Sequence, residues 1–147
     1  MSAKLQDEKQ ILNLLHNVVA FYNLDDKTLK EVLKMGNQVT FPPSKVIVKE
    51  GDRETTMYLV LSGGVEVRKK GNVIAKLGAG QFFGEMAFLD NMPTERSADV
   101  LAIEETSCFA LPAWGWYDFL KKNPEVAIEV IRSLAARLRE LNQRLAY

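Results

Sequence analysis

The sequence predicts a mainly β fold, an antiparallel sandwich or barrel, with helices before and after it along the chain. Short runs of β-branched and apolar residues fill the stretch from Val39 to Leu111, and glycine-rich or polar turns separate them. Helical periodicity precedes this stretch and returns after Pro112. Many short strands with regular turns are typical of an antiparallel sandwich or barrel.

The first segment, about residues 8–38, is expected to be helical. Ile11, Leu12, Leu15, Val18 and Val19 recur at helical spacing. A second helix is expected over residues 24–33, with an acidic start near Asp25 and a stop at Gly36. Pro42 and Pro43 then exclude further helix and open the β segment.

The middle segment, residues 39–111, carries the strand signals. The expected strands are 46–48, 57–61, 65–67, 73–75, 98–102 and 107–111. A helical signal over residues 84–89 interrupts them. The adjacent Phe82 and Phe83 should point to opposite sides of an extended chain, so that one lines a pocket while the other packs.

The last segment, residues 112–147, is expected to form two helices. The first covers Ala113–Lys122, and the second starts at Asn123-Pro124 and runs to about Ala146. Apolar residues alternate by three and four along the second helix, at Ile131, Leu134, Leu138, Leu141 and Leu145. This seam can pack on the chain's own β segment, or it can form a homodimer through residues 124–146.

Composition sets limits on the function. A chain of 147 residues suits one domain with a real core, so residues 1–147 are expected to form a single domain. Lys+Arg and Asp+Glu both number 19, and this balance gives no support to nucleic-acid binding. No apolar run approaches the roughly 20 residues that span a bilayer. The polar start and the lone Cys108, expected to be a buried reduced thiol, favour a cytoplasmic protein that does not contact membranes.

The stretch from Phe82 to Leu89, followed by Arg96, looks suited to a small anionic ligand. Gly84 allows a tight turn, and a short helix from Glu85 would offer free N–H groups to an anion. The Arg96 guanidinium suits phosphate oxygens, and Glu85 can accept hydrogen bonds from vicinal hydroxyls. A ligand with both a phosphate and a sugar hydroxyl would satisfy both side chains. The alternative is a structural salt bridge between Glu85 and Arg96.

At these residues the chain resembles the cyclic-nucleotide-binding domain family. The family's phosphate-binding cassette reads as an apolar residue, Gly-Glu-x-Ala, a variable loop and Arg-Ser/Thr/Ala-Ala. The sequence has Phe83-Gly84-Glu85-Met86-Ala87 and Arg96-Ser97-Ala98, and Glu50-Gly51-Asp52 and residues 57–67 upstream are also similar. The resemblance covers roughly residues 10–147. Two features depart from the pattern: Glu54 stands where a small residue is usual, and the loop 90–95 is slightly longer than in many members.

The resemblance implies an eight-stranded jelly roll over residues 39–111, with the cassette at 82–98, N-terminal helices and a long C-terminal helix. It implies a ligand site made of Gly84, Glu85, Met86, Ala87, Arg96, Ser97 and Ala98. Arg96 would pair with the exocyclic phosphate oxygens, and Glu85 would accept from the ribose 2′-hydroxyl. Further sugar or base contacts are expected from Val67, Leu77, Phe83, Leu138, Leu141 and Asn142.

The function implied is that of a signalling sensor, in which movement of the C-terminal helix reports the ligand to an effector protein that the sequence does not identify. Cyclic AMP is favoured over cyclic GMP, because in this family a threonine beside the arginine often goes with guanine preference and here the residue is Ser97. The alternative is a scaffold that binds no ligand and mediates protein interaction or dimerisation.

Neither an enzyme, a metal site nor a cofactor besides the ligand is expected. His16 is the single histidine and has no cluster of metal ligands near it in sequence. No nucleophile–base pair is evident either. A truncated transcription regulator is a third hypothesis, but neutral charge and the end of the chain at Tyr147 argue against direct DNA binding.

Overall fold

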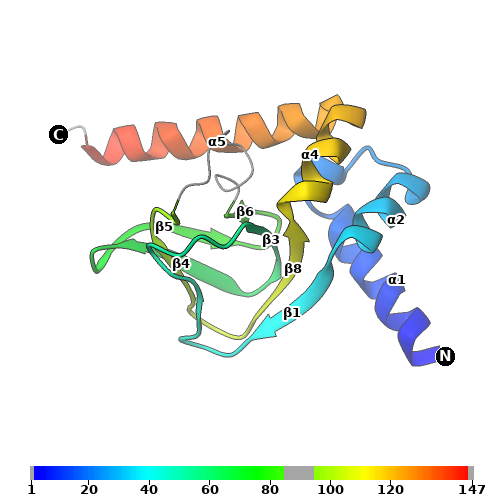
Figure 1. Cartoon of the computed structure of the whole chain (residues 1–147), viewed down its shortest axis with the longest axis horizontal. Helices are drawn as coiled ribbons and strands as arrows, with labels where there is room; N and C mark the ends of the chain where they lie inside the picture. The colour runs from blue at the N-terminus through cyan, green and yellow to red at the C-terminus, as the bar shows by residue number, and fades with distance from the viewer. Residues whose placement is uncertain (1, 85–94, 146–147) are drawn as a thin grey trace.

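Two antiparallel four-stranded sheets form the centre of the molecule (Figure 1). The computed structural model describes residues 2–84 and 95–145, and these contain eight strands. One sheet has the order β1-β8-β3-β6, with β1 at Asn37–Phe41, β8 at Thr106–Pro112, β3 at Thr56–Ser62 and β6 at Phe82–Phe83. The other has the order β2-β7-β4-β5, with β2 at Val46–Val48, β7 at Asp99–Ala102, β4 at Gly64–Lys69 and β5 at Asn72–Gly78. The predicted antiparallel jelly roll is confirmed.

Helices precede and follow the sheets, as predicted. α1 (Ser2–His16), the short 3₁₀ helix η1 (Val19–Phe21) and α2 (Asp26–Met35) come first, and α4 (Ala113–Lys122) and α5 (Pro124–Leu145) come last. In Figure 1, α1, α2 and α4 gather at one end of the sheets, and α5 runs along the strands toward the C-terminus. α4 has the predicted bounds, and α5 begins at the proline that the sequence marked as its first turn.

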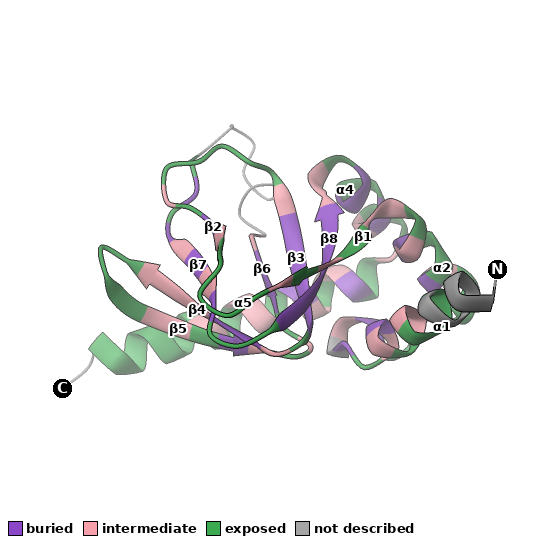
Figure 2. Ribbon diagram, turned by 90° about the horizontal axis from the view of Figure 1, so that it is seen from below, coloured by how far each residue is buried: buried purple, intermediate pink, exposed green. Residues whose placement is uncertain are grey.

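Strand alternation divides the interior into two apolar clusters. In β3, Met57 and Leu59 face a cluster shared with the helices, whereas Tyr58 and Val60 face a cluster between the two sheets. The buried residues along β3 and β8 are visible in Figure 2. Both strands are therefore buried on both faces, which explains why their sequences read as continuous apolar runs.

The aromatic pair of β6 shows the same alternation. Phe82 joins the cluster with the helices, and Phe83 joins the cluster between the sheets. Both side chains are buried. The prediction that the two rings point to opposite sides is confirmed.

The predicted start and stop residues, Asp25 and Gly36, flank α2. The Asp25 carboxylate accepts a hydrogen bond from the Thr28 amide at 2.8 Å, so it caps the helix as predicted. The helix ends before Gly36, but this glycine has extended backbone, with φ −143°. A Cβ at Gly36 would lie 2.0 Å from the Ala110 carbonyl oxygen of β8. Close packing against β8, rather than a left-handed turn, is thus what requires glycine here.

The structure differs from the sequence-based elements in three places. α1 begins at Ser2, earlier than residue 8, because its polar first residues contain no glycine or proline to prevent helix. β1 was not among the predicted strands, since its five residues are exposed or half-buried and carry a weak apolar signal. β6 was also missed as a strand because it has only two residues.

A buried threonine joins the two sheets. Thr106 is fully buried at the start of β8, and its hydroxyl accepts from the Gly64 amide of β4 at 3.2 Å. The same hydroxyl lies 2.9 Å from the carbonyl oxygens of Gly64 and Glu104, to which it can donate. One side chain therefore satisfies backbone groups where β4 of one sheet meets β8 of the other.

Thr106→Val should lower the free energy of unfolding by about 1–3 kcal/mol, because an isosteric methyl leaves the buried Gly64 amide without that partner. Urea denaturation of the whole chain measures the change. The control is Thr40→Val, at an exposed position in β1, which should change stability by less than about 0.5 kcal/mol. Equal effects of the two substitutions would show that the Thr106 hydroxyl does not stabilise the sheet junction.

Candidate functional site

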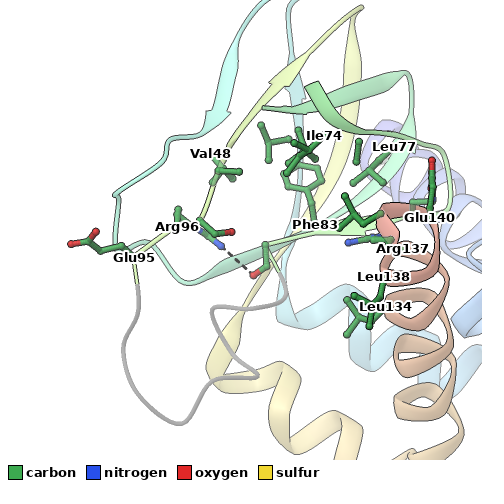
Figure 3. Close-up of a pocket in the computed structure, with 18 residues that line it drawn as sticks. Val48, Ile74, Leu77, Phe83, Glu95, Arg96, Leu134, Arg137, Leu138 and Glu140 are labelled. Atoms are coloured by element: carbon green, nitrogen blue, oxygen red, sulfur yellow. Dashed lines mark hydrogen bonds between the residues drawn. The ribbon is translucent and has the colours of Figure 1, made fainter. Parts of the chain in front are cut away.

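A cavity of about 480 Å³ lies between the strands and α5 (Figure 3). Its lining comes from both sheets, from the chain on either side of the cassette loop, and from one side of α5. The residues are Val48, Val67, Ile74, Ala75, Leu77, Gln81, Phe83, Gly84, Glu95, Arg96, Ser97, Ala98, Val100, Leu134, Arg137, Leu138, Glu140 and Leu141. The volume is within the range of small-molecule sites.

The walls of the cavity next to the sheets are apolar. Val48, Leu77, Phe83 and Val100 are buried and belong to the cluster between the sheets. Behind Phe83 lies Tyr58, with the two rings stacked at a centroid distance of 5.1 Å. This surface can accept the apolar faces of a sugar or a base, and the stacked ring behind it keeps Phe83 in place.

Arg96 places a buried positive charge at the cavity. The residue is only 7% exposed. One guanidinium nitrogen, Nη2, donates to the Thr56 carbonyl at 2.6 Å, and Nη1 donates to the Gly84 carbonyl at 3.1 Å. The second of these bonds is drawn in Figure 3. Buried charges need such partners, and the two carbonyls hold the guanidinium against the cavity wall.

Backbone bonds fix the segment that carries Arg96. The Arg96 amide donates to the Asp52 carbonyl at 2.6 Å, and the Gly51 amide donates to the Arg96 carbonyl at 2.9 Å. Lys69 Nζ donates to the Ser97 carbonyl at 2.8 Å. The Gly51-Asp52 turn, singled out in the sequence, therefore positions the residues that precede β7.

Gly84 is required by both conformation and space. Its φ of +81° lies in the left-handed region, where side chains are strained. A Cβ at this position would lie 2.8 Å from the Thr56 carbonyl oxygen and 2.9 Å from Arg96 Nη1. The glycine thus lets the backbone approach the guanidinium closely enough to accept its hydrogen bond.

The side of α5 that borders the cavity combines leucines with two charged residues (Figure 3). Arg137 lies over the Phe82 ring, with its guanidinium carbon 4.5 Å from the ring centroid, and it donates to the Phe82 carbonyl. Further along the helix, Arg144 donates to the Ile74 carbonyl of β5 at 2.6 Å and also pairs with Glu140 at 3.2 Å. Two arginines thus attach α5 to the strands.

Burial controls the protonation of Cys108, which lies in the cluster between the sheets. Loss of hydration raises the pKa of the Cys108 thiol to about 12, so the thiol is neutral at physiological pH. Its side chain is fully buried, as the sequence predicted.

The structure brings most of the described site residues together. Gly84, Arg96, Ser97, Ala98, Val67, Leu77, Phe83, Leu138 and Leu141 all line the cavity. Asn142 is exposed and lies outside the lining. Glu85, Met86 and Ala87 lie outside the described residues.

Sequence reasoning missed several lining residues. Arg137 and Glu140 were not among the predicted site residues, yet both border the cavity. Their spacing from Leu134, Leu138 and Leu141 places all five on adjacent turns, which is the signal that could have shown it. The aliphatic residues Val48, Ile74 and Val100 gave no signal beyond that of ordinary strand residues.

None of the helices within 2–84 and 95–145 has both the length and the apolar character needed to cross a membrane. Within the same ranges, histidine, cysteine, aspartate and glutamate side chains do not gather in groups of three or more that could hold a metal ion.

An apolar cavity with a buried arginine at its edge suits an anion that also carries apolar surface. A family model for the cyclic nucleotide-binding domain matches residues 38–123, more than half of the chain. The chain therefore belongs to the cyclic nucleotide-binding domain family, and the resemblance seen in the sequence is confirmed.

Three similar proteins illustrate the relationship. The cyclic AMP receptor protein of Thermus thermophilus is 33% identical over 130 residues, which are 85% of this chain and 59% of that protein. A cyclic nucleotide-gated potassium channel of Rhizobium etli is 33% identical over 134 residues, which are 91% of this chain and 37% of the channel. The crystal structure of a cyclic nucleotide-binding domain from Methylobacillus flagellatus has a TM-score of 0.76 and 30% identity, covering 95% of this chain and 82% of that one. The chain thus spans less than two thirds of either full-length relative.

Gly84→Ala should destabilise the chain and weaken the site, because it combines the strained φ with a clash against Thr56 and Arg96. The expected loss is about 2–4 kcal/mol in the free energy of unfolding. The matched control is Gly71→Ala, where φ is +82° but no atom lies within 4 Å of the new Cβ, and about 1 kcal/mol is expected. Chemical denaturation measures both free energies of unfolding. An equal loss would show that the clash of the new Cβ with Thr56 and Arg96 does not contribute to the loss of stability.

Proposed function

We propose that this chain binds a cyclic nucleotide in the cavity between the sheets and α5, and that it acts as a cytoplasmic signalling sensor. The observation that carries the proposal is the buried Arg96 guanidinium at the edge of an apolar cavity. A cyclic nucleotide has the matching parts, since its phosphate is anionic and its sugar and base offer apolar faces. Membership of the cyclic nucleotide-binding domain family supports the same conclusion.

The phosphate lies at the Arg96 end in this proposal. The guanidinium already faces the carbonyls of Thr56 and Gly84, and a phosphate beside it would take charge-assisted hydrogen bonds. The Ser97 hydroxyl and the Ala98 amide, both on the lining, are the further donors. By family resemblance, Glu85 accepts from the ribose 2′-hydroxyl, and the amides of Met86 and Ala87 complete the cassette.

The sugar and base occupy the apolar walls in this proposal. Val67, Leu77 and Phe83 provide the surface from the strands, and Leu138 and Leu141 cover the base from α5. Arg137 is a further polar group on the same side of the helix, and it can face the base where the sequence had suggested Asn142. Cyclic AMP is proposed as the preferred ligand, on the ground that Ser97 rather than threonine follows Arg96.

α5 is the element that would transmit binding. It supplies the lining residues opposite the sheets, and its contacts with the strands include the two carbonyl bonds from Arg137 and Arg144. Since a ligand shifts an equilibrium only through its different affinity for two states, a ligand that touches α5 favours the state in which α5 is closed. The effector that reads this change is a protein partner outside the chain.

The test of binding is a thermal-shift titration with cyclic AMP, cyclic GMP and linear AMP in parallel. A ligand that binds only the native state raises its stability by mass action. We expect saturable stabilisation by the cyclic nucleotides, with the lower midpoint for cyclic AMP. A cooperative melt that none of the three nucleotides shifts would contradict the proposed function.

Arg96→Lys should weaken cyclic AMP binding by about tenfold or more, because lysine cannot reproduce the guanidinium fork and a charge-assisted bond contributes roughly 1.5–3 kcal/mol. Titration calorimetry measures the dissociation constant. The control is Arg132→Lys, on α5, where the exposed guanidinium pairs with Glu129 and does not line the cavity. If both variants bind as tightly as the unmodified chain, the phosphate is not at Arg96.

Arg144→Gln should make α5 open more often, since it removes the bond to the Ile74 carbonyl that holds the far end of the helix. Hydrogen exchange of residues 124–145 should be faster in this variant without ligand, and saturating cyclic AMP should slow exchange in the unmodified chain. Arg132→Gln serves as the control on the same helix. Exchange rates that neither the variant nor the ligand changes would contradict a moving α5.

A second candidate function is a dimeric interaction scaffold. Five apolar residues of α5 are exposed, namely Ile128, Ile131, Leu138, Leu141 and Leu145. Exposed residues at this spacing suit pairing with another helix, including α5 of a second copy. Sedimentation equilibrium with and without Ile131→Lys distinguishes a dimer from a monomer, and a dimer that binds no nucleotide would favour the scaffold over the sensor.

A further inference from the structure

Glu54 is the residue of the β2–β3 turn that departs from the family pattern, and the structure gives it a defined position. Its carboxylate accepts a hydrogen bond from the Tyr58 hydroxyl, with 3.0 Å between Oε1 and the phenolic oxygen. Glu54 itself is exposed, whereas Tyr58 is only 8% exposed. The carboxylate is therefore tied to a side chain that cannot move freely.

Tyr58 is held from two sides. Its ring stacks on Phe83 at 5.1 Å and meets Phe41 edge-on at 6.1 Å. Burial raises the pKa of Tyr58 to about 12, the Glu54 carboxylate adds to this rise, and the Arg96 charge opposes it. The phenol thus stays protonated and remains a donor to Glu54 at all physiological pH values.

This arrangement places Glu54 in the same short segment as the Thr56 carbonyl that holds Arg96. Arg96 Nη2 donates to the carbonyl of Thr56, which stands between Glu54 and Tyr58 in the chain. Two consecutive peptide units span at most about 7 Å, so the Glu54 and Thr56 backbones are near neighbours. The Tyr58 hydroxyl bonds to Glu54, and the Tyr58 ring stacks on Phe83, which lines the same cavity as Arg96.

Two other carboxylates near this rim, among the described residues, have a cationic partner. Arg53 and Glu95 lie 4.0 Å apart and are largely exposed, so their opposite charges offset each other at a distance. Lys69 lies 3.9 Å from the Glu50 carboxylate. The Tyr58 hydroxyl is a neutral partner and does not offset the charge of Glu54.

We propose that Glu54 is an affinity-determining residue, whose tethered carboxylate repels the ligand's phosphate at the Arg96 end of the cavity and so weakens its binding. The inference rests on the proposed function, because it assumes a phosphate beside Arg96. Charges within about 10 Å of each other are not fully screened at moderate salt, and such a repulsion at a protein surface can change affinity by about two- to tenfold. The chain would then respond to higher nucleotide concentrations than it would with a neutral residue at this position.

The test compares Glu54→Gln with the unmodified chain by calorimetric titration of cyclic AMP at about 20 mM and at about 1 M sodium chloride. Glutamine keeps an acceptor for the Tyr58 hydroxyl and removes only the charge. At low salt the dissociation constant should fall by about two- to tenfold. At high salt, where screening shortens the reach of charges to about 3 Å, the two proteins should bind nearly equally.

Glu105→Gln is the matched control, since it removes an exposed carboxylate in the turn between β7 and β8. This turn lies at the end of β7 opposite to the segment that carries Arg96. This control should leave the dissociation constant within about 1.5-fold at either salt concentration.

If Glu54→Gln gives no gain over Glu105→Gln while the unmodified chain binds, the inference fails and the proposed function stands. A gain that persists at high salt would also overturn it, because a change in turn shape rather than charge would then be responsible. If neither the unmodified chain nor Glu54→Gln binds, the proposed function fails and the inference fails with it.

Tyr58→Phe tests the tether separately. It leaves the Glu54 charge but frees the carboxylate to move toward water, so a smaller gain in the same direction is expected at low salt. A loss of affinity in this variant would show that the hydrogen bond serves to position Phe83 and would overturn the role given to the tether.

Discussion

The hydrogen bonds of the buried Arg96 guanidinium are the interaction on which the candidate site depends. They join the segment before β7 to the Thr56 carbonyl of β3 and to the Gly84 carbonyl after β6. A buried charge without partners would be costly, and here the partners are backbone carbonyls that leave Arg96 on the cavity lining. The requirement for glycine at position 84 follows directly, because any side chain there would meet the guanidinium.

The apolar part of the site follows from strand alternation. β6 is only two residues long, yet Phe82 joins the cluster with the helices, whereas Phe83 joins the cluster between the sheets and lines the cavity. The same short strand also receives α5, since Arg137 contacts both the ring and the carbonyl of Phe82. A ligand that contacts Phe83 would therefore act on the residue next to the Phe82 contact of α5. This link is the physical basis for proposing α5 as the element that responds to a ligand.

Much of this could be predicted from the sequence, and the failures have physical causes. Local signals were strong for α2, with Asp25 as its cap, and for the helix that starts at Pro124. The motif residues Gly84 and Arg96 were recognisable because their chemistry depends on residue type and close spacing.

β1 was missed because tertiary pairing with β8, rather than its own apolar pattern, makes it a strand. Arg137 was missed because its spacing from the leucines of α5 shows only that they share one side of the helix, whereas the packing of that side against β6 is a tertiary contact. The contact between Glu54 and Tyr58 was likewise out of reach, although Glu54 itself was conspicuous as a departure from the family pattern.

The most direct measurement is a crystal structure of the chain with cyclic AMP at saturating concentration. The account predicts the cyclic phosphate within hydrogen-bond distance of the Arg96 guanidinium, and the base between the strands and the leucines of α5. A nucleotide bound with its phosphate away from Arg96, or bound outside this cavity, would contradict the account.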